Sequence, residues 1–218
     1  MSICEKSVLQ HIVERVGFSK LIDKIIVATS KNHENDAIEM LCKKINIDCF
    51  RGSENNVLSR FQEAVKYYNI QDGDLIVRIC CDCPLVCPDL IDMIILHHGD
   101  NDLTTNCIKR TYPDGLDVEV FKAGLLNHPD FNNINFFEKE YSEMNFKGFK
   151  ITNIVQEEDL SSLRWTLDTQ RDYEYITKIY EALYKPRQIF LMEDVLNEVD
   201  SRHGKLGKKV RTAKLSSP

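Results

Sequence analysis

The sequence predicts an α/β fold with a mostly parallel sheet and helices on both of its faces. Segments with apolar residues at helical spacing alternate with short apolar runs through the N-terminal half. The runs are rich in β-branched residues, which suits strands buried on both faces. This alternation predicts right-handed crossover connections, and such connections place helices on both sides of parallel strands.

The expected elements follow the chain in order. Residues 8–16, 35–45 and 57–68 have helical periodicity, and residues 24–29, 47–50 and 74–79 form strands between and after them. A helix is expected over 89–98, strands over 102–107 and 116–120, and a return to the sheet from residue 151. A strand over 163–168 leads into a helix that Thr169 caps and that continues to residue 183, and a last helix spans 192–199.

Composition bounds the domain organisation and the partners. The chain has 218 residues, 43% of them hydrophobic, and a net charge of −6. We expect one domain over residues 1–200 and a basic, flexible tail over 201–218. The negative charge argues against nucleic-acid binding, and no apolar run reaches the roughly 18 residues of a membrane span. Because no signal peptide is recognisable, the sequence predicts a cytoplasmic protein.

Two acids stand at the carboxyl ends of predicted strands. Asp82 follows the run Leu75–Ile79 and precedes Pro84, and Asp168 ends the run LRWTLD. Ligands of open α/β sheets bind beyond the carboxyl ends of the strands, so both carboxylates are candidates to hold a metal or a substrate. The alternative for Asp82 is a cap of the turn into the next helix.

Other chemistry-bearing residues allow more than one interpretation. The run LDVEV reads as a half-buried strand that carries Asp117 and Glu119 on one face. Residues 127–150 are polar and fit an excursion over the active face or a subunit contact, so a homodimer is an open possibility. A zinc or redox site is conceivable at four clustered cysteines, but no second Cys-x-x-Cys pair completes a familiar pattern: Cys80, Cys81, Cys83 and Cys87.

Four ordered motifs carry a family resemblance. The segments RGSENNVLSRF, VRICCDCPLV, YPDGLDVEVF and LRWTLDTQRDYEYI occur in this order. With them the chain resembles the spore coat polysaccharide biosynthesis protein F family, which is similar to the cytidylyltransferases that make CMP-Kdo and CMP-sialic acid. The resemblance spans residues 8–183. It implies a Rossmann-like nucleotide-diphospho-sugar transferase sandwich and an attack of a sugar oxygen on the α-phosphate of a nucleoside triphosphate, with CTP favoured, for surface polysaccharide synthesis.

The resemblance also assigns residues. It implies that Asp82 and Asp168 are the catalytic acids and bind Mg²⁺, which agrees with their placement at strand ends. For nucleotide binding the candidates are Arg51, Gly52, Ser53 and Arg78. An arginine paired with a neighbouring acid is the alternative for Arg51 and Arg78. The residues expected to face the sugar are Tyr112, Asp114, Gly115, Asp117 and Glu119.

The chain also departs from the family. Members begin with a strand and a glycine-rich loop that holds the triphosphate, and this segment has no counterpart in the sequence. We therefore expect two strand edges without partners, next to residues 24–29 and 74–79, and weak or no turnover. Cys81 replaces a usual Gly, Asn56 a usual Asp, and residues 139–141 an Arg-Glu-His segment.

These departures leave several explanations open. The sequence is either a fragment of a longer chain or a degenerate protein that has kept the shell of the fold. The corresponding functions are a nucleotidyltransferase and a non-catalytic subunit that binds sugar nucleotides or assists assembly. A glycosyltransferase is a third class, but it needs an Asp-x-Asp-like metal motif, and Asp82-Cys83-Pro84 does not supply the second acid.

Overall fold

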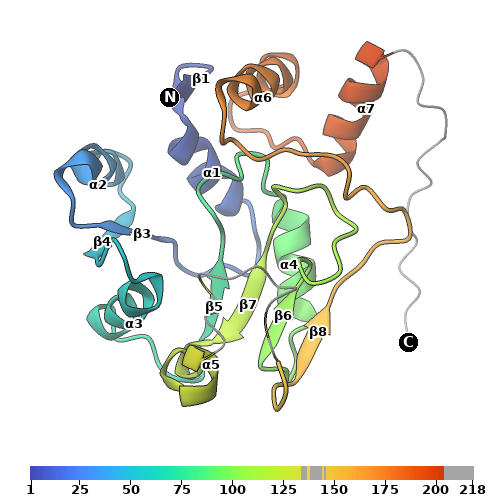
Figure 1. Cartoon of the computed structure of the whole chain (residues 1–218). Coiled ribbons are helices and arrows are strands. Elements are labelled where there is room, and N and C mark those ends of the chain that lie inside the picture. Colours follow the sequence, from blue (N-terminus) through green and yellow to red (C-terminus); the bar gives the residue numbers. More distant parts are fainter. Residues whose placement is uncertain (134–136, 138–143, 145, 204–218) are drawn as a thin grey trace.

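A four-stranded sheet forms the centre of the protein. The computed structural model describes residues 1–133, 137, 144 and 146–203 (Figure 1). The sheet has the order β5-β7-β6-β8 and comprises β5 (Leu75–Arg78), β6 (Leu103–Thr105), β7 (Glu119–Lys122) and β8 (Ile151–Asn153). Strand β7 pairs antiparallel with both β5 and β6, and β6 pairs parallel with β8. Three of the four strands therefore share one direction, and β7 alone runs against them.

A second, two-stranded sheet lies beside β5. It consists of β3 (Ile26–Ser30) and β4 (Asp48–Gly52), which run parallel in the register Ile26↔Asp48 to Ser30↔Gly52 (Figure 1). Among the described residues, β3 has only β4 as a strand partner and β5 has only β7. The expected pair of unpartnered strand edges is thus present in the described part of the chain.

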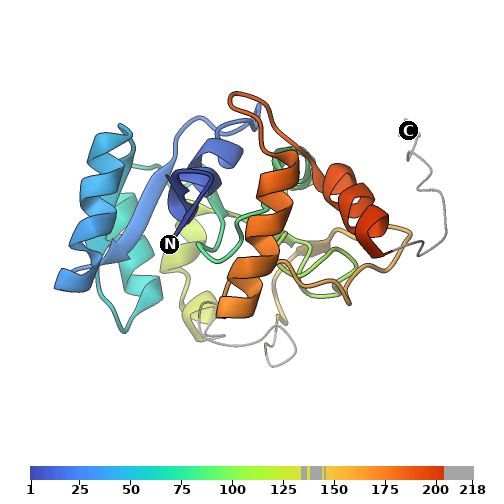
Figure 2. The same cartoon turned by 90° about the horizontal axis from the view of Figure 1, so that it is seen from above.

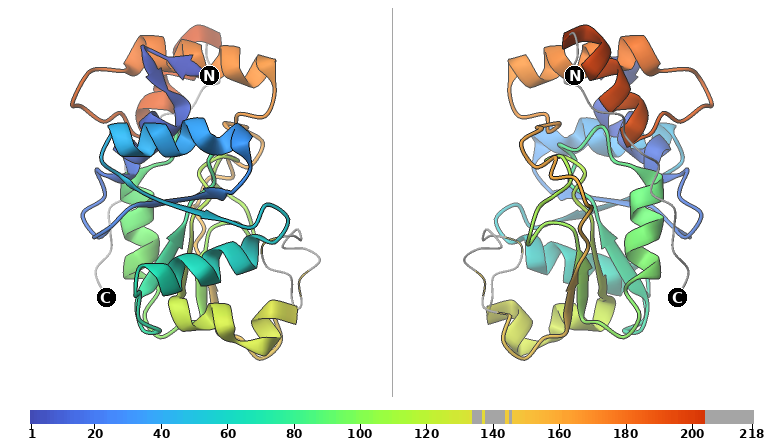
Figure 3. Two further views of the ribbon diagram at one scale, coloured as in Figure 1. Left: turned by 90° about the vertical axis from the view of Figure 1, so that its left-hand side faces the viewer. Right: turned by 90° about the vertical axis from the view of Figure 1, so that its right-hand side faces the viewer.

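Helices cover both faces of the central sheet (Figure 3). On one face, Val77 and Val120 pack in a cluster with residues of α1 (Val8–Val16) and α4 (Pro88–Leu96). On the other face, Ile76 and Phe121 pack against α3 (Val57–Tyr67) and the segments η2 (Ala123–Asn127) and α5 (Pro129–Asn133). Neighbouring residues of β5 and β7 point to opposite faces, so this alternation builds the sandwich.

The two-stranded sheet has a smaller core of its own. Val27 packs with Val13 of α1 and with Cys42 of α2 (Asp36–Lys44), which follows the short helix η1 (His33–Asn35). Helix α1 contributes to both this core and the main one, because its apolar residues recur at helical spacing on more than one side. It therefore ties the two sheets together.

The C-terminal helices pack at the end of the molecule where the N-terminus lies (Figure 2). Helix α6 (Gln170–Leu183) contacts the N-terminal hairpin of β1 (Ser2–Ile3) and β2 (Lys6–Ser7), because the Tyr173 hydroxyl donates to the Ser2 carbonyl at 2.6 Å. Helix α7 (Met192–His203) packs against α6, and Val195 is 1% exposed in the main core. No helix among the described residues is long and apolar enough to cross a membrane.

Most expected elements are present, and three differ from the expectation. Residues 163–168 form no strand; only an isolated parallel bridge joins Asp114 and Arg164. The strand expected over 116–120 begins at Glu119. Helix α7 extends to His203, past the domain boundary expected at residue 200. The rest of the expected tail lies outside the described residues. Residues 139–141, where the family has an Arg-Glu-His segment, also lie outside them. Parts of the segment 127–150 are likewise not described.

Candidate active site

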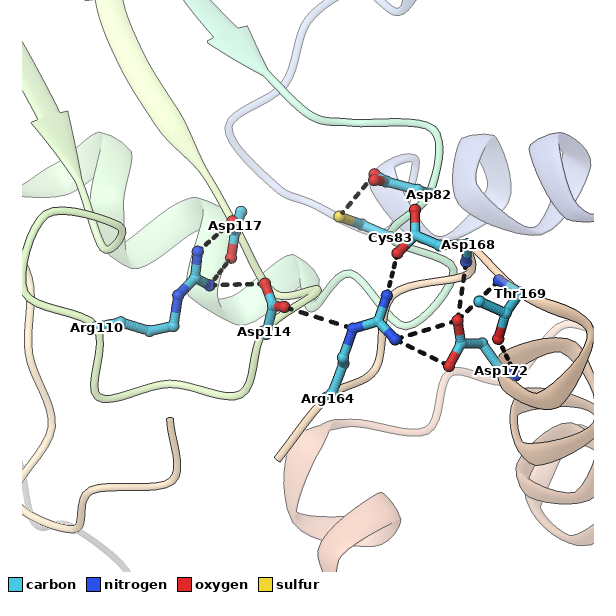
Figure 4. Close-up of polar contacts among 9 residues, drawn as sticks. All are labelled: Asp82, Cys83, Arg110, Asp114, Asp117, Arg164, Asp168, Thr169 and Asp172. Atoms are coloured by element: carbon cyan, nitrogen blue, oxygen red, sulfur yellow. Dashed lines mark hydrogen bonds and ion pairs between the residues drawn. The ribbon is translucent and has the colours of Figure 1, made fainter. Parts of the chain in front are cut away.

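The two acids predicted to bind metal are neighbours in the fold. The amide of Leu167 donates to the carbonyl of Asp82 at 2.8 Å, which places the residue after it, Asp168, beside the turn that follows β5 (Figure 4). Asp82 is half-buried and Asp168 is exposed. The thiol of Cys83 lies 3.4 Å from an oxygen of Asp82. The site thus presents two carboxylates that are 86 residues apart in sequence (168 − 82) at the carboxyl edge of the central sheet.

Asp168 is held at the start of α6. Thr169 is the N-cap, its hydroxyl accepts from the Asp172 amide at 3.2 Å, and the Asp172 carboxylate accepts from the Thr169 amide at 2.8 Å. This reciprocal capping box fixes the first turn of the helix. The Asp172 carboxylate also accepts from the Asp168 amide at 3.1 Å. The main chain that carries Asp168 is therefore held on both sides.

Arg164 links three carboxylates of the site. Its guanidinium forms an ion pair with Asp168, contacts Asp172 at 3.0 Å and lies 4.0 Å from Asp114 (Figure 4). The neighbouring Asp168 and Asp172 raise the pKa of Arg164, against the opposing effect of desolvation. Asp114 belongs to the predicted sugar-facing segment, and Asp168 and Asp172 lie at the start of α6. Arg164 therefore connects the sugar-facing segment to the predicted metal-binding acids.

A second arginine organises the predicted sugar-facing residues. Arg110 lies 3.2 Å from Asp114 and donates to both carboxylate oxygens of Asp117, one of them at 2.8 Å. Burial raises the pKa of Asp114 even though Arg110 and Arg164 lower it, and the charges of Asp117 and Asp82 raise it further. Burial therefore outweighs the two arginines at Asp114.

Gly115 holds the sugar-facing segment against the segment that carries Arg164. Its φ is +102°, and a Cβ there would lie 2.6 Å from the carbonyl carbon of Trp165. Only glycine satisfies both the left-handed backbone and the close approach. The Asp114 amide donates to the Leu163 carbonyl at 2.9 Å, and the Trp165 amide donates to the Asp114 carbonyl at 2.6 Å.

Tyr112 and Glu119 have surroundings other than those expected. Tyr112 is 6% exposed and packs in the main core. Glu119 is 5% exposed and pairs across the sheet with Arg78, which donates to it at 2.5 Å. The prediction of a half-buried strand with both acids on one face is therefore wrong. Asp117 precedes β7 and contacts Arg110, whereas Glu119 lies in β7, is buried and pairs with Arg78. A sugar contact of Tyr112 or Glu119 stays a prediction.

The predicted nucleotide residues lie at the ends of β4 and β5. Arg51 forms ion pairs with Asp36 at 2.6 Å and with Glu39 at 2.7 Å, and it also donates to two backbone carbonyls. Arg78 pairs with Glu119. The alternative interpretation, an arginine paired with an acid, describes both in this structure. Nucleotide contacts by them stay predictions.

Gly52 and Ser53 lie against an arginine that sequence reasoning missed. A Cβ on Gly52 would lie 2.7 Å from Cγ of Arg60, and Arg60 donates to the Ser53 carbonyl at 2.6 Å. The Nε atom of Arg60 is buried and has no hydrogen-bond partner among the described residues. Arg60 stands four residues after Asn56, the N-cap of α3, and it belongs to the segment RGSENNVLSRF that carries the family resemblance, which is the signal that could have found it.

The side chains that could act as metal ligands limit which metal the site can bind. Among the described residues, no group of three or more His, Cys, Asp or Glu side chains could hold a metal ion. This also removes support for the zinc site considered at the cysteine cluster, where Cys83 and Cys87 are buried. What the fold supplies is the pair Asp82 and Asp168.

Comparison with known proteins identifies the family. A family model described as cytidylyltransferase matches residues 1–199. The chain belongs to the cytidylyltransferase family. The match covers all elements of the site: the turn at Asp82, the Arg110–Asp117 segment and the start of α6 at Asp168.

Two relatives and two solved structures show the range of the similarity. The chain is 34% identical over 195 residues to protein MJ1063 of Methanocaldococcus jannaschii, and this alignment covers 85% of this chain and 75% of that protein. It is 32% identical to the spore coat polysaccharide biosynthesis protein SpsF of Bacillus subtilis, over 80% of this chain and 74% of that one.

Among solved structures, a cytidylyltransferase from Leptospira borgpetersenii has a TM-score of 0.79 at 30% identity and covers 93% of this chain and 86% of its own. A CMP-2-keto-3-deoxy-manno-octonic acid synthetase in complex with CTP has a TM-score of 0.57 at 12% identity, covers 84% of this chain and 90% of its own, and shows the fold alone. The Rossmann-like nucleotidyltransferase fold expected from the sequence is confirmed.

Proposed function

We propose that this cytidylyltransferase-family protein transfers a cytidylyl group from CTP to a sugar that is destined for surface polysaccharide, and that it requires Mg²⁺. The observation that carries the proposal is the juxtaposition of Asp82 and Asp168 at the carboxyl edge of the sheet. Relatives with names of this kind support the reaction class: SpsF, and the octulosonate cytidylyltransferases of Shewanella frigidimarina and other bacteria.

The carboxylate pair fits Mg²⁺ better than a metal that needs a complete protein cage. Mg²⁺ keeps several waters and binds through one or two carboxylates together with substrate phosphates. The site offers two carboxylates, and among the described residues no third His, Cys, Asp or Glu side chain joins them in a metal-binding group. When bound, the ion neutralises charge on the phosphate oxygens. Asp82 and Asp168 are the residues that would hold it.

The remaining side chains divide into two roles. Arg164 restrains Asp168 through its ion pair and leaves the other carboxylate oxygen available. Asp114 and Asp117, positioned by Arg110, present acceptor oxygens to hydroxyl groups of the sugar. Backbone hydrogen bonds join the segments that carry these residues to one another.

The test is pyrophosphate release from CTP with a panel of neutral, amino and acidic sugars, at varied Mg²⁺. We expect the sugar-dependent release to fall at least about 100-fold in Asp82→Asn and Asp168→Asn, since even outer residues of metal sites can cost that much. Asp100→Asn is the matched control, because Asp100 is exposed and pairs with Lys150 on the surface. Equal release by Asp82→Asn and Asp100→Asn would refute the metal role.

A second candidate function is a non-catalytic subunit that binds sugar nucleotides. The pairing of Arg51 and Arg78 with acids favours it, because these two arginines are then not available to a triphosphate. It predicts nucleotide or partner binding that is independent of Mg²⁺ and unchanged in Asp82→Asn. A calorimetric titration of CTP with and without Mg²⁺ separates the two functions, and the weak turnover expected from the sequence stays a prediction until pyrophosphate release is measured.

A further inference from the structure

Arg15 is a buried cation that donates to three backbone carbonyls and also contacts the Tyr180 side chain. The residue lies on α1 and is 4% exposed. Its guanidinium donates to the carbonyls of Val86 at 2.7 Å, Phe190 at 2.9 Å and Leu85 at 3.3 Å, and lies 4.4 Å from the centre of the Phe190 ring. Burial lowers the pKa of Arg15. Burying a guanidinium without a carboxylate partner is costly. The hydrogen bonds to these carbonyls offset part of that cost, so the carbonyls are held in fixed positions around the guanidinium.

Tyr180 completes the same group of contacts from the opposite side. It lies on α6, is 1% exposed, and its hydroxyl donates to the carbonyl of Pro84 at 2.6 Å. Burial raises the pKa of Tyr180 to about 12, although Arg15 beside it acts in the other direction. The phenol therefore stays protonated and remains a donor at neutral pH.

The three consecutive carbonyls belong to the turn that carries Asp82. Side chains from α1 and α6 hold the carbonyls of Pro84, Leu85 and Val86, and the amide of Leu167 holds the carbonyl of Asp82 itself. Leu85 and Val86 are at most 1% exposed, so water cannot replace these donors. Two side chains thus bind the main chain at residues 84–86, within the turn that follows β5.

We propose that Arg15 and Tyr180 act as a positioning pair: they fix the turn 82–86 so that the Asp82 carboxylate meets Asp168 in the geometry that the metal needs. This rests on the proposed function, because it concerns the same carboxylate pair. Neither residue touches the substrate. Their effect passes through the backbone carbonyls of the turn, and Arg15 also joins the turn to the segment before α7 through Phe190.

The fold offers a matched pair of variants on one helix. Tyr180 and Tyr173 both lie on α6 and both donate to a backbone carbonyl at 2.6 Å, Tyr180 to Pro84 and Tyr173 to Ser2. Replacement by Phe removes one hydroxyl and one such bond in each case, and at Tyr180 it also removes the contact with its partner Arg15. Only Tyr180→Phe releases the turn of Asp82, whereas Tyr173→Phe releases the N-terminal hairpin.

The experiment measures Mn²⁺ binding to the full chain in the presence of CTP, by electron paramagnetic resonance. We expect Tyr180→Phe to weaken metal binding about 10-fold, the lower end for residues that orient metal ligands, and Tyr173→Phe to leave it unchanged. In pyrophosphate release, a higher metal concentration should restore kcat in Tyr180→Phe. Arg15→Lys, which keeps the charge but not the planar fork, should show the same metal-dependent rescue.

The outcomes distinguish this inference from the proposed function. If the wild-type chain binds CTP and Mn²⁺ but Tyr180→Phe and Tyr173→Phe have the same metal affinity, the positioning role is refuted and the proposed function stands. If the wild-type chain shows no metal-dependent CTP binding, the proposed function falls and the positioning role falls with it. A loss of kcat in Tyr180→Phe that excess metal does not restore also refutes the positioning role.

Discussion

The Leu167 amide donates to the Asp82 carbonyl at 2.8 Å, and this single bond joins the turn after β5 to the segment that leads into α6. It brings two acids from distant parts of the chain to one edge of the sheet, where ligands of α/β proteins bind. The bond does not involve either carboxylate. The backbone thus positions both side chains, while Asp82 also contacts the Cys83 thiol and Asp168 forms an ion pair with Arg164.

Arg164→Lys tests how far the site depends on this ion pair. A lysine keeps the positive charge but cannot contact Asp114, Asp168 and Asp172 together, since it lacks the planar array of donors. We expect kcat for pyrophosphate release to fall up to about 100-fold, the cost of a misplaced reacting group. The control is Arg171→Lys, an exposed position on α6. An unchanged kcat in Arg164→Lys would show that Asp168 needs no restraint.

Gly115→Ala should destabilise the protein far more than Gly148→Ala. Both glycines have positive φ, +102° and +96°, but only at Gly115 would a Cβ collide with backbone atoms, those of Trp165 and Thr166. We expect the free energy of unfolding to fall by at least about 1–3 kcal/mol more in Gly115→Ala, because overpacking adds to the strain shared by both positions. Urea denaturation of the two variants measures this difference. Equal losses would place the cost in φ alone.

The sequence predicted the elements that have a strong local period. Residues 8–16 form α1 as expected, because Ser7 caps the helix and apolar side chains recur on its inner faces. The strand β5 and the acid that follows it were also recognisable, since a β-branched run ends at Asp82. These features depend on neighbouring residues alone, so no tertiary information was required.

Residues 163–168 show where local pattern fails. Their alternating residues suit a strand, but their backbone bonds go to separate loops: the Trp165 amide to Asp114 and the Leu167 amide to Asp82. Single backbone hydrogen bonds hold the segment, and it forms no continuous ladder with a neighbouring strand. The periodicity of the sequence does not reveal this difference. Likewise, the pairing of Arg78 with Glu119 depends on β7 lying antiparallel beside β5, and strand order of this kind is not a property of either segment.

Arg78→Met separates a structural role from nucleotide binding. Glu119 is 5% exposed, so removing its partner in the sheet leaves a buried carboxylate in poor surroundings. We expect a loss in the free energy of unfolding, because the buried carboxylate loses a cation that compensates its charge, and recovery of most of this loss in the double variant Arg78→Met/Glu119→Leu. Chemical denaturation gives both values.

The double variant also decides the nucleotide contact predicted for Arg78. If Arg78 serves only the sheet, the restored double variant binds CTP with the affinity of the wild-type chain in a calorimetric titration. A stable double variant that has lost CTP binding would instead establish Arg78 as a nucleotide ligand, and the ion pair with Glu119 would then belong to the chain without nucleotide.

The alkaline stability of the protein should depend on Cys42. Burial, with a further contribution from Cys49, raises the pKa of Cys42 from 9.0 to about 12. Between these values the unfolded chain loses the thiol proton and the native chain keeps it, so the native state binds more protons and stability falls as pH rises. Below pH 9.0 this group contributes no pH dependence.

Cys42→Ala should therefore make the free energy of unfolding less dependent on pH above pH 9.0, because the variant lacks the one thiol proton that the native chain retains and the unfolded chain loses. Urea denaturation at pH values from neutral to about 10.5 measures the slope, and the wild-type chain should lose more stability than the variant across the alkaline part. The variant is less stable at neutral pH because Cys42 is 0% exposed and fills the core between α2 and β3, so the comparison uses the change with pH within each protein. Parallel profiles would show that the native thiol ionises as readily as the unfolded one.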